Sequence, residues 1–233
     1  MENFVLSVAK HLLLILLLSM NYGTIWAQFE GTFEQPNYFE GMIYSKITLG
    51  GKYGQAFIEN KPNTQMVMMI KEGDYIVNLS GGQRPVSRIF IADSNRMYIM
   101  DPKNKTAFKN EGNITMQKKL KKDTTVYVAI PTYDSLKILG NICYGFLIKK
   151  KDEEIKVYIT PKYRVNLAHY NGKKNADAMF VTPGIYGCIP LKTIRITKDL
   201  TTEITVTKIS EKSLDKKGFG IPPDWKVDYR DYR

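Results

Sequence analysis

The sequence has few of the side chains on which metal sites and nucleophilic enzymes depend. Two cysteines and two histidines occur among its 233 residues. A structural zinc site needs about four such ligands at close spacing, whereas Cys143 and Cys188 lie far apart in the chain. Phosphate-binding loops, His-Glu-x-x-His motifs and nucleophile elbows do not occur either. The sequence therefore predicts no metal site, no cofactor and no catalytic residue.

Long apolar runs are also scarce. The N-terminal stretch places Lys10 before a short apolar run, residues 12–18, and small residues lead to Ala27. This layout is typical of a secretory signal peptide, and the run is shorter than the about 20 residues that span a bilayer. We expect a signal peptide over residues 1–27 and a single domain over residues 28–233, with a retained N-terminal anchor as the alternative. Because no later stretch is apolar enough to span a membrane and no lipid-attachment cysteine follows the run, the sequence predicts a periplasmic or secreted protein.

Acidic residues are outnumbered by basic ones. The formal net charge is +11, and basic residues gather at residues 118–122, 149–151 and 173–174. Such a surface favours acidic partners, for example an anionic membrane surface or an acidic glycan. A solvated basic surface without a partner is the simpler alternative. Nucleic acid is the weakest option, because the chain carries an export signal and no nucleic-acid recognition motif.

Alternating apolar and polar residues dominate the chain from Tyr38 onward. This period of two, together with many β-branched residues, predicts β-strands. Turn residues separate the strands, as in the Lys-Glu-Gly-Asp stretch at residues 71–74. The strand patterns occupy residues 38–50, 65–82, 87–109, 138–163 and 189–210.

Helical patterns are rare by comparison. Residues 161–184 are compatible with one or two short helices, and residues 210–217 with a single turn capped by Ser210. The predicted fold class is mainly β, with one curved antiparallel sheet of roughly eight to eleven strands and a few short helices. A sheet of that size tends to curl, so its concave face is either covered by apolar residues or left as a cavity.

Several stretches resemble a family of exported bacterial domains of unknown function. "FEGMIYSKIT" is similar to that family's opening "FEGxIxYxIT", and "NRMYIMDPKNKTAF" is similar to its "xxMYxLDPKKKTYx" hairpin. "ILGNICYGFLI" followed by "IKVYIT" resembles its cysteine-bearing hairpin, and "SLDKKGFGIPPDWK" resembles its closing segment. The pieces keep their order from Phe39 to Lys226. A sister group carries a glycine-rich "GLPGLI" where this chain has "YGCIPLK", which places the chain with the first group.

The resemblance implies a half-barrel of the periplasmic lipoprotein-carrier type (LolA/LolB-like). In such a fold the curved antiparallel sheet wraps around a few short helices, and its concave side can shelter an acyl chain. The family also has a cysteine at the position of Cys143 but no regular partner at Cys188. It has no established activity that could be transferred to this chain.

Cys143 is open to three interpretations. A disulfide with Cys188 suits an exported protein if the two Cα atoms lie within about 7 Å, and two buried free thiols are equally compatible with the sequence. A nucleophile would need a base, for which His169 is the only histidine beyond residue 27. No cysteine-hydrolase signature flanks Cys143, so a hydrolase built on Cys143 and His169 is the weakest interpretation.

The methionines suggest a binding surface. Met66, Met68 and Ile70 share one face of their predicted strand, and Met97 and Ile99 share one face of theirs. Methionine is flexible and adapts to varied apolar shapes such as acyl chains. These five residues are therefore the predicted ligand-lining residues, with ordinary core packing as the alternative.

Together these patterns predict a non-enzymatic exported protein of the cell envelope. In the leading hypothesis it binds a lipid, an acyl chain or an acylated protein in an apolar concavity. In the alternative it is an envelope scaffold that binds another protein through loops, sheet edges or its C-terminal tail, residues 222–233. That tail carries aromatic and arginine residues, which are common in protein contacts.

Overall fold

The chain forms strands through most of the part that the structure describes. The computed structural model describes residues 37–52, 54, 59, 62–110, 127–170, 180 and 182–229. The strands and the short 3-10 helices (η) within these residues are β1 Gly41–Gly50, β2 Gln65–Lys71, β3 Asp74–Ser80, β4 Val86–Ile91, β5 Arg96–Asp101, β6 Thr106–Asn110, β7 Ile130–Ile138, β8 Asn141–Lys150, β9 Glu153–Arg164, η1 Leu167–His169, β10 Cys188–Thr197, β11 Thr201–Glu211, η2 Lys216–Phe219 and β12 Lys226–Asp228.

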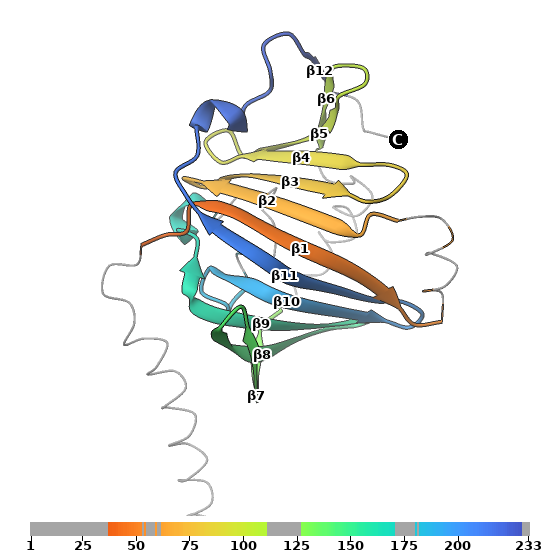
Figure 1. Ribbon diagram of the computed structural model, residues 1–233, viewed down its shortest axis with the longest axis vertical. Helices are drawn as coiled ribbons and strands as arrows, with labels where there is room; N and C mark the ends of the chain where they lie inside the picture. Colours follow the sequence, from red (N-terminus) through yellow and green to blue (C-terminus); the bar gives the residue numbers. More distant parts are fainter. Residues whose placement is uncertain are drawn as a thin grey trace, which may run out of the picture. The chain divides into compact units, whose positions relative to one another are not determined.

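These strands join one sheet of 12, in the order β12-β6-β5-β4-β3-β2-β1-β11-β10-β9-β8-β7 (Figure 1). All neighbours run antiparallel except β12 and β6, which run parallel. The sheet is curved and open, with β12 and β7 at its edges. The predicted fold class, a mainly β protein built on one curved sheet, is confirmed, and the parallel strand β12 is an addition to it.

Two tight turns set the register of two hairpins. Glu72 and Gly73 connect β2 to β3 with φ angles of 48° and 90°, and Leu139 and Gly140 connect β7 to β8 with φ angles of 48° and 80°. Two successive positive φ angles are typical of type I′ turns, whose twist matches that of the flanking strands. The hairpin predicted from the turn residues at 71–74 is therefore confirmed.

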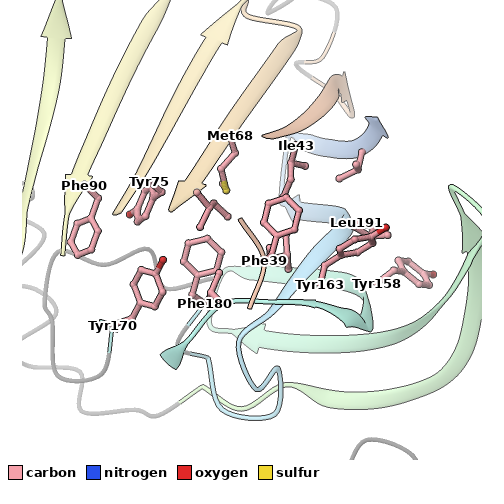
Figure 2. Packing of buried hydrophobic residues seen from close by; sticks show 14 of the residues in the cluster. Phe39, Ile43, Met68, Tyr75, Phe90, Tyr158, Tyr163, Tyr170, Phe180 and Leu191 are labelled. Carbon is pink, nitrogen blue, oxygen red and sulfur yellow. The ribbon is translucent and has the colours of Figure 1, made fainter. Parts of the chain in front are cut away.

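The main hydrophobic core lies on one face of the sheet, which we call the inner face. Ile43 of β1 and Met68 of β2 lie opposite each other in the register and both belong to this core. Tyr170 and Phe180 pack against Tyr75 of β3, with ring centroids 6.4 and 5.6 Å away. Figure 2 shows these side chains gathered in the space around which the strands curve. The inner face is thus filled over part of its area by aromatic rings.

A second apolar cluster lies on the opposite, outer face, over β2 to β6. The segment that follows β11 covers it: Phe219 of η2 is 4% exposed and packs in this cluster, and Trp225 packs against it. β12 then pairs with β6. Of the tail that we considered as a contact for a partner, Trp225 and Val227 pack against this cluster, whereas Tyr229 is 68% exposed. Residues 230–233 lie outside the described residues.

The alternation in the sequence does not predict β7 and β12. β7 contains Pro131 and Asp134, and its register with β8 shifts between Pro131 and Ser135. A shift of this kind interrupts the two-residue period on which the strand predictions rest. β12 has only three residues and gains its place by pairing with a strand that is distant in sequence.

Within the segment 161–184, where one or two short helices were predicted, the structure has the end of a strand, a short 3-10 helix and a helical residue at Phe180. β9 extends to Arg164, and η1 covers only Leu167–His169. Asn166 caps η1 by accepting a hydrogen bond from the backbone N–H of Ala168. Residues 171–179 lie outside the described residues, so the rest of that prediction is not addressed.

The predicted cap at Ser210 is wrong. β11 continues through Ser210 to Glu211 because it pairs with β1 over that whole length. Asp215 caps the following turn instead, and its side chain accepts a hydrogen bond from the backbone N–H of Lys217 at 3.0 Å. The ladder with β1 therefore outweighs the local capping preference of a serine.

Candidate ligand-binding cavity

An apolar cavity lies on the inner face near the middle of the sheet. Its volume is about 150 Å³, and β1, β2, β3, β10 and β11 form its wall. None of the described lining residues is charged. They are Ile43, Ser45, Met66, Met68, Val77, Ile189, Pro190, Thr193, Ile204 and Val206.

The register of the central strands brings one side of the wall together. Ser45 of β1 lies opposite Met66 of β2 and opposite Val206 of β11. The pairing of β1 with β11 shifts at this point, with Thr207 as the extra residue. The Oγ1 of Thr207 donates a hydrogen bond to the carbonyl oxygen of Tyr44 at 3.2 Å. The bulge is thus held by a side chain, and Val206 and Ser45 share the inner face.

The other side of the wall comes from an irregular part of β10. The register between β10 and β9 shifts on both sides of Pro190. Proline has no N–H for a ladder bond, and prolines in sheets are found mainly at such irregular positions. Ile189 and Pro190 are both buried and line the cavity. The gap in regular pairing therefore leaves apolar side chains facing the centre of the inner face.

The cavity is small for a whole lipid. Pockets for drug-sized ligands are typically about 300–1,000 Å³, against about 150 Å³ here. Met66 is half-buried, and methionine side chains change rotamer easily and fill irregular space. In the present conformation the cavity has room for only a short apolar segment, and movement of Met66 would enlarge it.

A larger hollow, of about 620 Å³, lies near the end of β1. Ile47 and Leu49 of β1 contribute to it, and Ile47 pairs with Ile204, which lines the cavity. Lys46 is exposed and also borders the hollow. The cavity and the hollow share no described lining residue, but both lie along β1.

The structure separates the five predicted ligand-lining residues. Met66 and Met68 line the cavity. Ile70 is 1% exposed and packs in the inner core. Met97 and Ile99 lie on β5, which two strands separate from β2, and they do not border the cavity. Contact of any of the five with a ligand stays a prediction.

Ser45 and Val206 are cavity residues that sequence reasoning missed. Ser45 lies in the alternating stretch of β1, at a position where its neighbours two residues away, Ile43 and Ile47, are apolar. A small polar residue on an otherwise apolar face was therefore a usable signal. The role of Val206 could not be found in this way, because it depends on the bulge in β11 and on the pairing of β11 with β1.

Both cysteines are free thiols buried in the structure. The disulfide, one of the alternatives that the sequence allowed, is not formed. Cys143 donates to the carbonyl oxygen of Asn141, with 3.6 Å between sulfur and oxygen. Burial raises the pKa of Cys143, and it raises the pKa of Cys188 to about 11. Both groups are therefore protonated near neutral pH, which is the opposite of what an activated nucleophile needs.

His169 lies in a different environment, at the end of η1. A small pocket of about 160 Å³ is bordered by His169 together with Glu40 and Glu72. The ring packs over Gly73, where an added Cβ would lie 2.6 Å from the His169 Cγ. Gly73 is therefore needed both for its positive φ and for this close approach.

The described residues contain no group of three His, Cys, Asp or Glu side chains that could hold a metal ion. In the same part of the chain no helix is long and apolar enough to cross a membrane.

Comparison with known proteins finds likeness in structure only. No protein-family model and no curated protein matches the sequence. An uncharacterized conserved protein from Thermus thermophilus is 8% identical, with a TM-score of 0.44 over 81% of this chain and 90% of that protein. A LolA superfamily protein from Nitrosomonas europaea is 8% identical, with a TM-score of 0.36 over 79% of this chain and 91% of that protein.

A structure of PNGF-II is similar over part of its length. It is 14% identical, with a TM-score of 0.44 over 82% of this chain, and the match spans 32% of PNGF-II.

Proposed function

We propose that this chain is an exported, non-enzymatic binding protein that takes the acyl chain of a lipid or of an acylated protein into the inner-face cavity. The observation that carries the proposal is an uncharged cavity at the centre of the sheet, walled by Met66, Met68 and branched apolar side chains. Burying apolar surface from water is favourable by about 25 cal/mol per Å², and it requires no specific geometry of the ligand. Such a wall suits a flexible hydrocarbon chain.

The hollow beside the cavity supports the same proposal. A chain longer than the cavity extends along Ile47 and Leu49 of β1 into the hollow. The hollow thus gives room for the part of a long apolar chain that the cavity cannot hold.

A matched pair of substitutions on β2 tests the proposal. Met66 lines the cavity, whereas its neighbour Val67 projects to the opposite face of the same strand. The full chain is titrated with a fatty acid that carries an environment-sensitive dansyl group. Met66→Trp fills the cavity and weakens binding about 10-fold or more, whereas Val67→Trp binds like the wild type. Equal effects of the two substitutions would contradict binding at this face.

Native mass spectrometry of the exported protein is the second test. Purification without strong detergent should retain an adduct of lipid mass, and Met66→Trp should lose it. If the wild type carries no adduct and does not bind the dansyl probe, acyl binding is wrong for this chain.

The structure describes only one of the three basic clusters. Of the basic clusters, residues 118–122 and 173–174 lie outside the described residues. In the third cluster, Lys149 lies 3.8 Å from Glu154, and Lys150 lies 3.4 Å from Glu153. Part of that charge is therefore neutralised within the domain. We propose weak attraction to anionic membranes, which flotation with phosphatidylglycerol vesicles should show at low salt and lose at high salt.

A second candidate function follows from the edge strand β7. Among the described strands β7 pairs only with β8. It exposes Ile130 and Tyr133, at 58% and 56%, and Ile142 of β8 is 59% exposed. An edge strand with apolar side chains can receive an extended segment of another protein. In this alternative the chain is an envelope scaffold, and Ile130→Lys should abolish co-purification of the partner without affecting the dansyl probe.

A further inference from the structure

One hydroxyl group in the wall of the cavity has no hydrogen-bond partner. Ser45 is 4% exposed, and its Oγ has no partner among the described residues. The neighbouring backbone groups of β1 are engaged in ladders with β2 and β11 on both sides. Buried hydroxyl groups in proteins are nearly always hydrogen-bonded, to protein, water or ligand. A molecule that enters the cavity can supply the partner that Ser45 lacks among the described residues.

We propose that Ser45 is the polar contact of a ligand site and donates a hydrogen bond to the carbonyl oxygen of an acyl ester or acyl amide. This inference rests on the proposed function and narrows the ligand class. Ser45 lies among Ile43, Met66, Met68 and Val206, so its hydroxyl is surrounded by apolar side chains, and Thr193 is the other hydroxyl residue of the lining. Binding sites of this kind fix the orientation of an apolar ligand through a few polar groups.

The charge of the wall decides between a neutral carbonyl and a carboxylate. None of the described residues that line the cavity is charged. A buried carboxylate without a cation loses much of its hydration energy, and one hydroxyl does not replace it. A carbonyl oxygen of an ester or amide needs only one donor and carries no net charge. The site therefore favours an acyl group attached to glycerol or to an amine over a free fatty acid bound through its carboxylate at Ser45.

The test compares three probes with the same number of carbon atoms: methyl decanoate, N-methyldecanamide and undecane. Each displaces the dansyl-labelled fatty acid from the full-length protein. Ser45→Ala should weaken binding of the ester and of the amide about 3- to 10-fold, the range that one neutral hydrogen bond gives. Binding of undecane should stay unchanged. Ser45→Thr keeps the hydroxyl and should restore the preference for a carbonyl. A higher affinity for the amide than for the ester would point to an acylated protein, and the reverse to an ester lipid.

An infrared measurement separates a direct contact from a structural effect. The ester probe, ¹³C-labelled at its carbonyl, should show a lower stretching frequency when bound to the wild type, and this shift should disappear in Ser45→Ala. Equal weakening of all three probes, or an unchanged carbonyl frequency, would overturn the role of Ser45.

The same probes test the proposed function separately from the role of Ser45. If undecane and the ester both bind and Met66→Trp blocks both, acyl binding stands even when Ser45→Ala has no effect. If no probe binds the wild type, the proposed function itself is wrong, and the inference about Ser45 is wrong with it.

Discussion

The Oη of Tyr158 donates a hydrogen bond to the Oδ2 of Asp134 at 2.7 Å, and this bond joins β9 to β7 across β8. The Nζ of Lys156 lies 2.8 Å from the same oxygen, and Thr132 donates to the other carboxylate oxygen. Three donors thus converge on one carboxylate, above Gly145 of β8, which pairs with Tyr158. The edge strand is held by side chains at the place where its backbone register is interrupted.

Gly145 should be required for this arrangement. A Cβ at this position would collide with Oδ1 of Asp134 and Oγ1 of Thr132. We expect Gly145→Ala to lower the free energy of unfolding by about 1–3 kcal/mol, as overpacking does in well-packed sites. Urea denaturation followed by circular dichroism measures the change. Gly218→Ala is the control, because nothing lies within 4 Å of a Cβ there; a similar loss in both variants would show that crowding at Asp134 is not the cause.

The same carboxylate should make stability depend on pH in acid. Burial raises the pKa of Asp134, but the hydrogen bonds from Lys156, Thr132 and Tyr158 outweigh it and lower the pKa from 3.8 to about 2. Because the folded-state pKa is depressed, the contribution of Asp134 is present above about pH 4 and is lost as the pH falls through about 2.

Asp134→Asn is the variant that isolates this effect. The carboxylate is partly exposed, so we expect the substitution to cost only about 1 kcal/mol at pH 7. The difference in unfolding free energy between wild type and Asp134→Asn should shrink between pH 4 and pH 2. A difference that stays constant over that range would mean that the ionised carboxylate does not contribute.

The sequence predicts the strands with regular alternation and misses those that depend on side-chain contacts. β1 to β6 and β8 to β11 follow from period-two patterns and from turn residues such as Glu72 and Gly73. β7 does not, because Asp134 and the register shift after Pro131 break the period, and its attachment depends on Tyr158, which lies on β9. Local patterns carry no information on such distant partners.

The candidate site, too, is predicted only where it depends on local alternation. Alternation alone places Met66 and Met68 on one face of β2, and both line the cavity. It also groups them with Met97 and Ile99 of β5, although β3 and β4 lie between β2 and β5. Which strands become neighbours is decided by long-range pairing, so a cavity wall formed by β1, β10 and β11 could not be assembled from the sequence.

The state of the two cysteines can be measured directly. Cys143 and Cys188 are buried free thiols whose pKa values burial raises. We expect the intact mass to be that of the reduced protein, without the loss of two hydrogens that a disulfide requires. In the folded protein a maleimide reagent at pH 7 should label neither residue within minutes, and in urea it should label both. Rapid labelling of Cys143 in the folded protein would contradict its burial and reopen a role as nucleophile.

The C-terminal segment should unfold together with the sheet that it covers. Trp225 packs against the outer-face cluster that contains Phe219, Ile76 and Ile89. The chain has two tryptophans, of which Trp26 belongs to the predicted signal peptide, so Trp225 is the fluorescent reporter of the exported protein. We expect its emission and the circular dichroism of the sheet to change at the same urea concentration.

Phe219→Ala should lower the free energy of unfolding by about 3 kcal/mol, because it empties a buried site. It should also move the Trp225 transition to a lower urea concentration than that of the sheet. Phe219→Leu keeps most of the volume and should keep the two transitions together. An early Trp225 transition in the wild type would mean that residues 222–229 detach independently, and the tail would again be available as a contact for a partner.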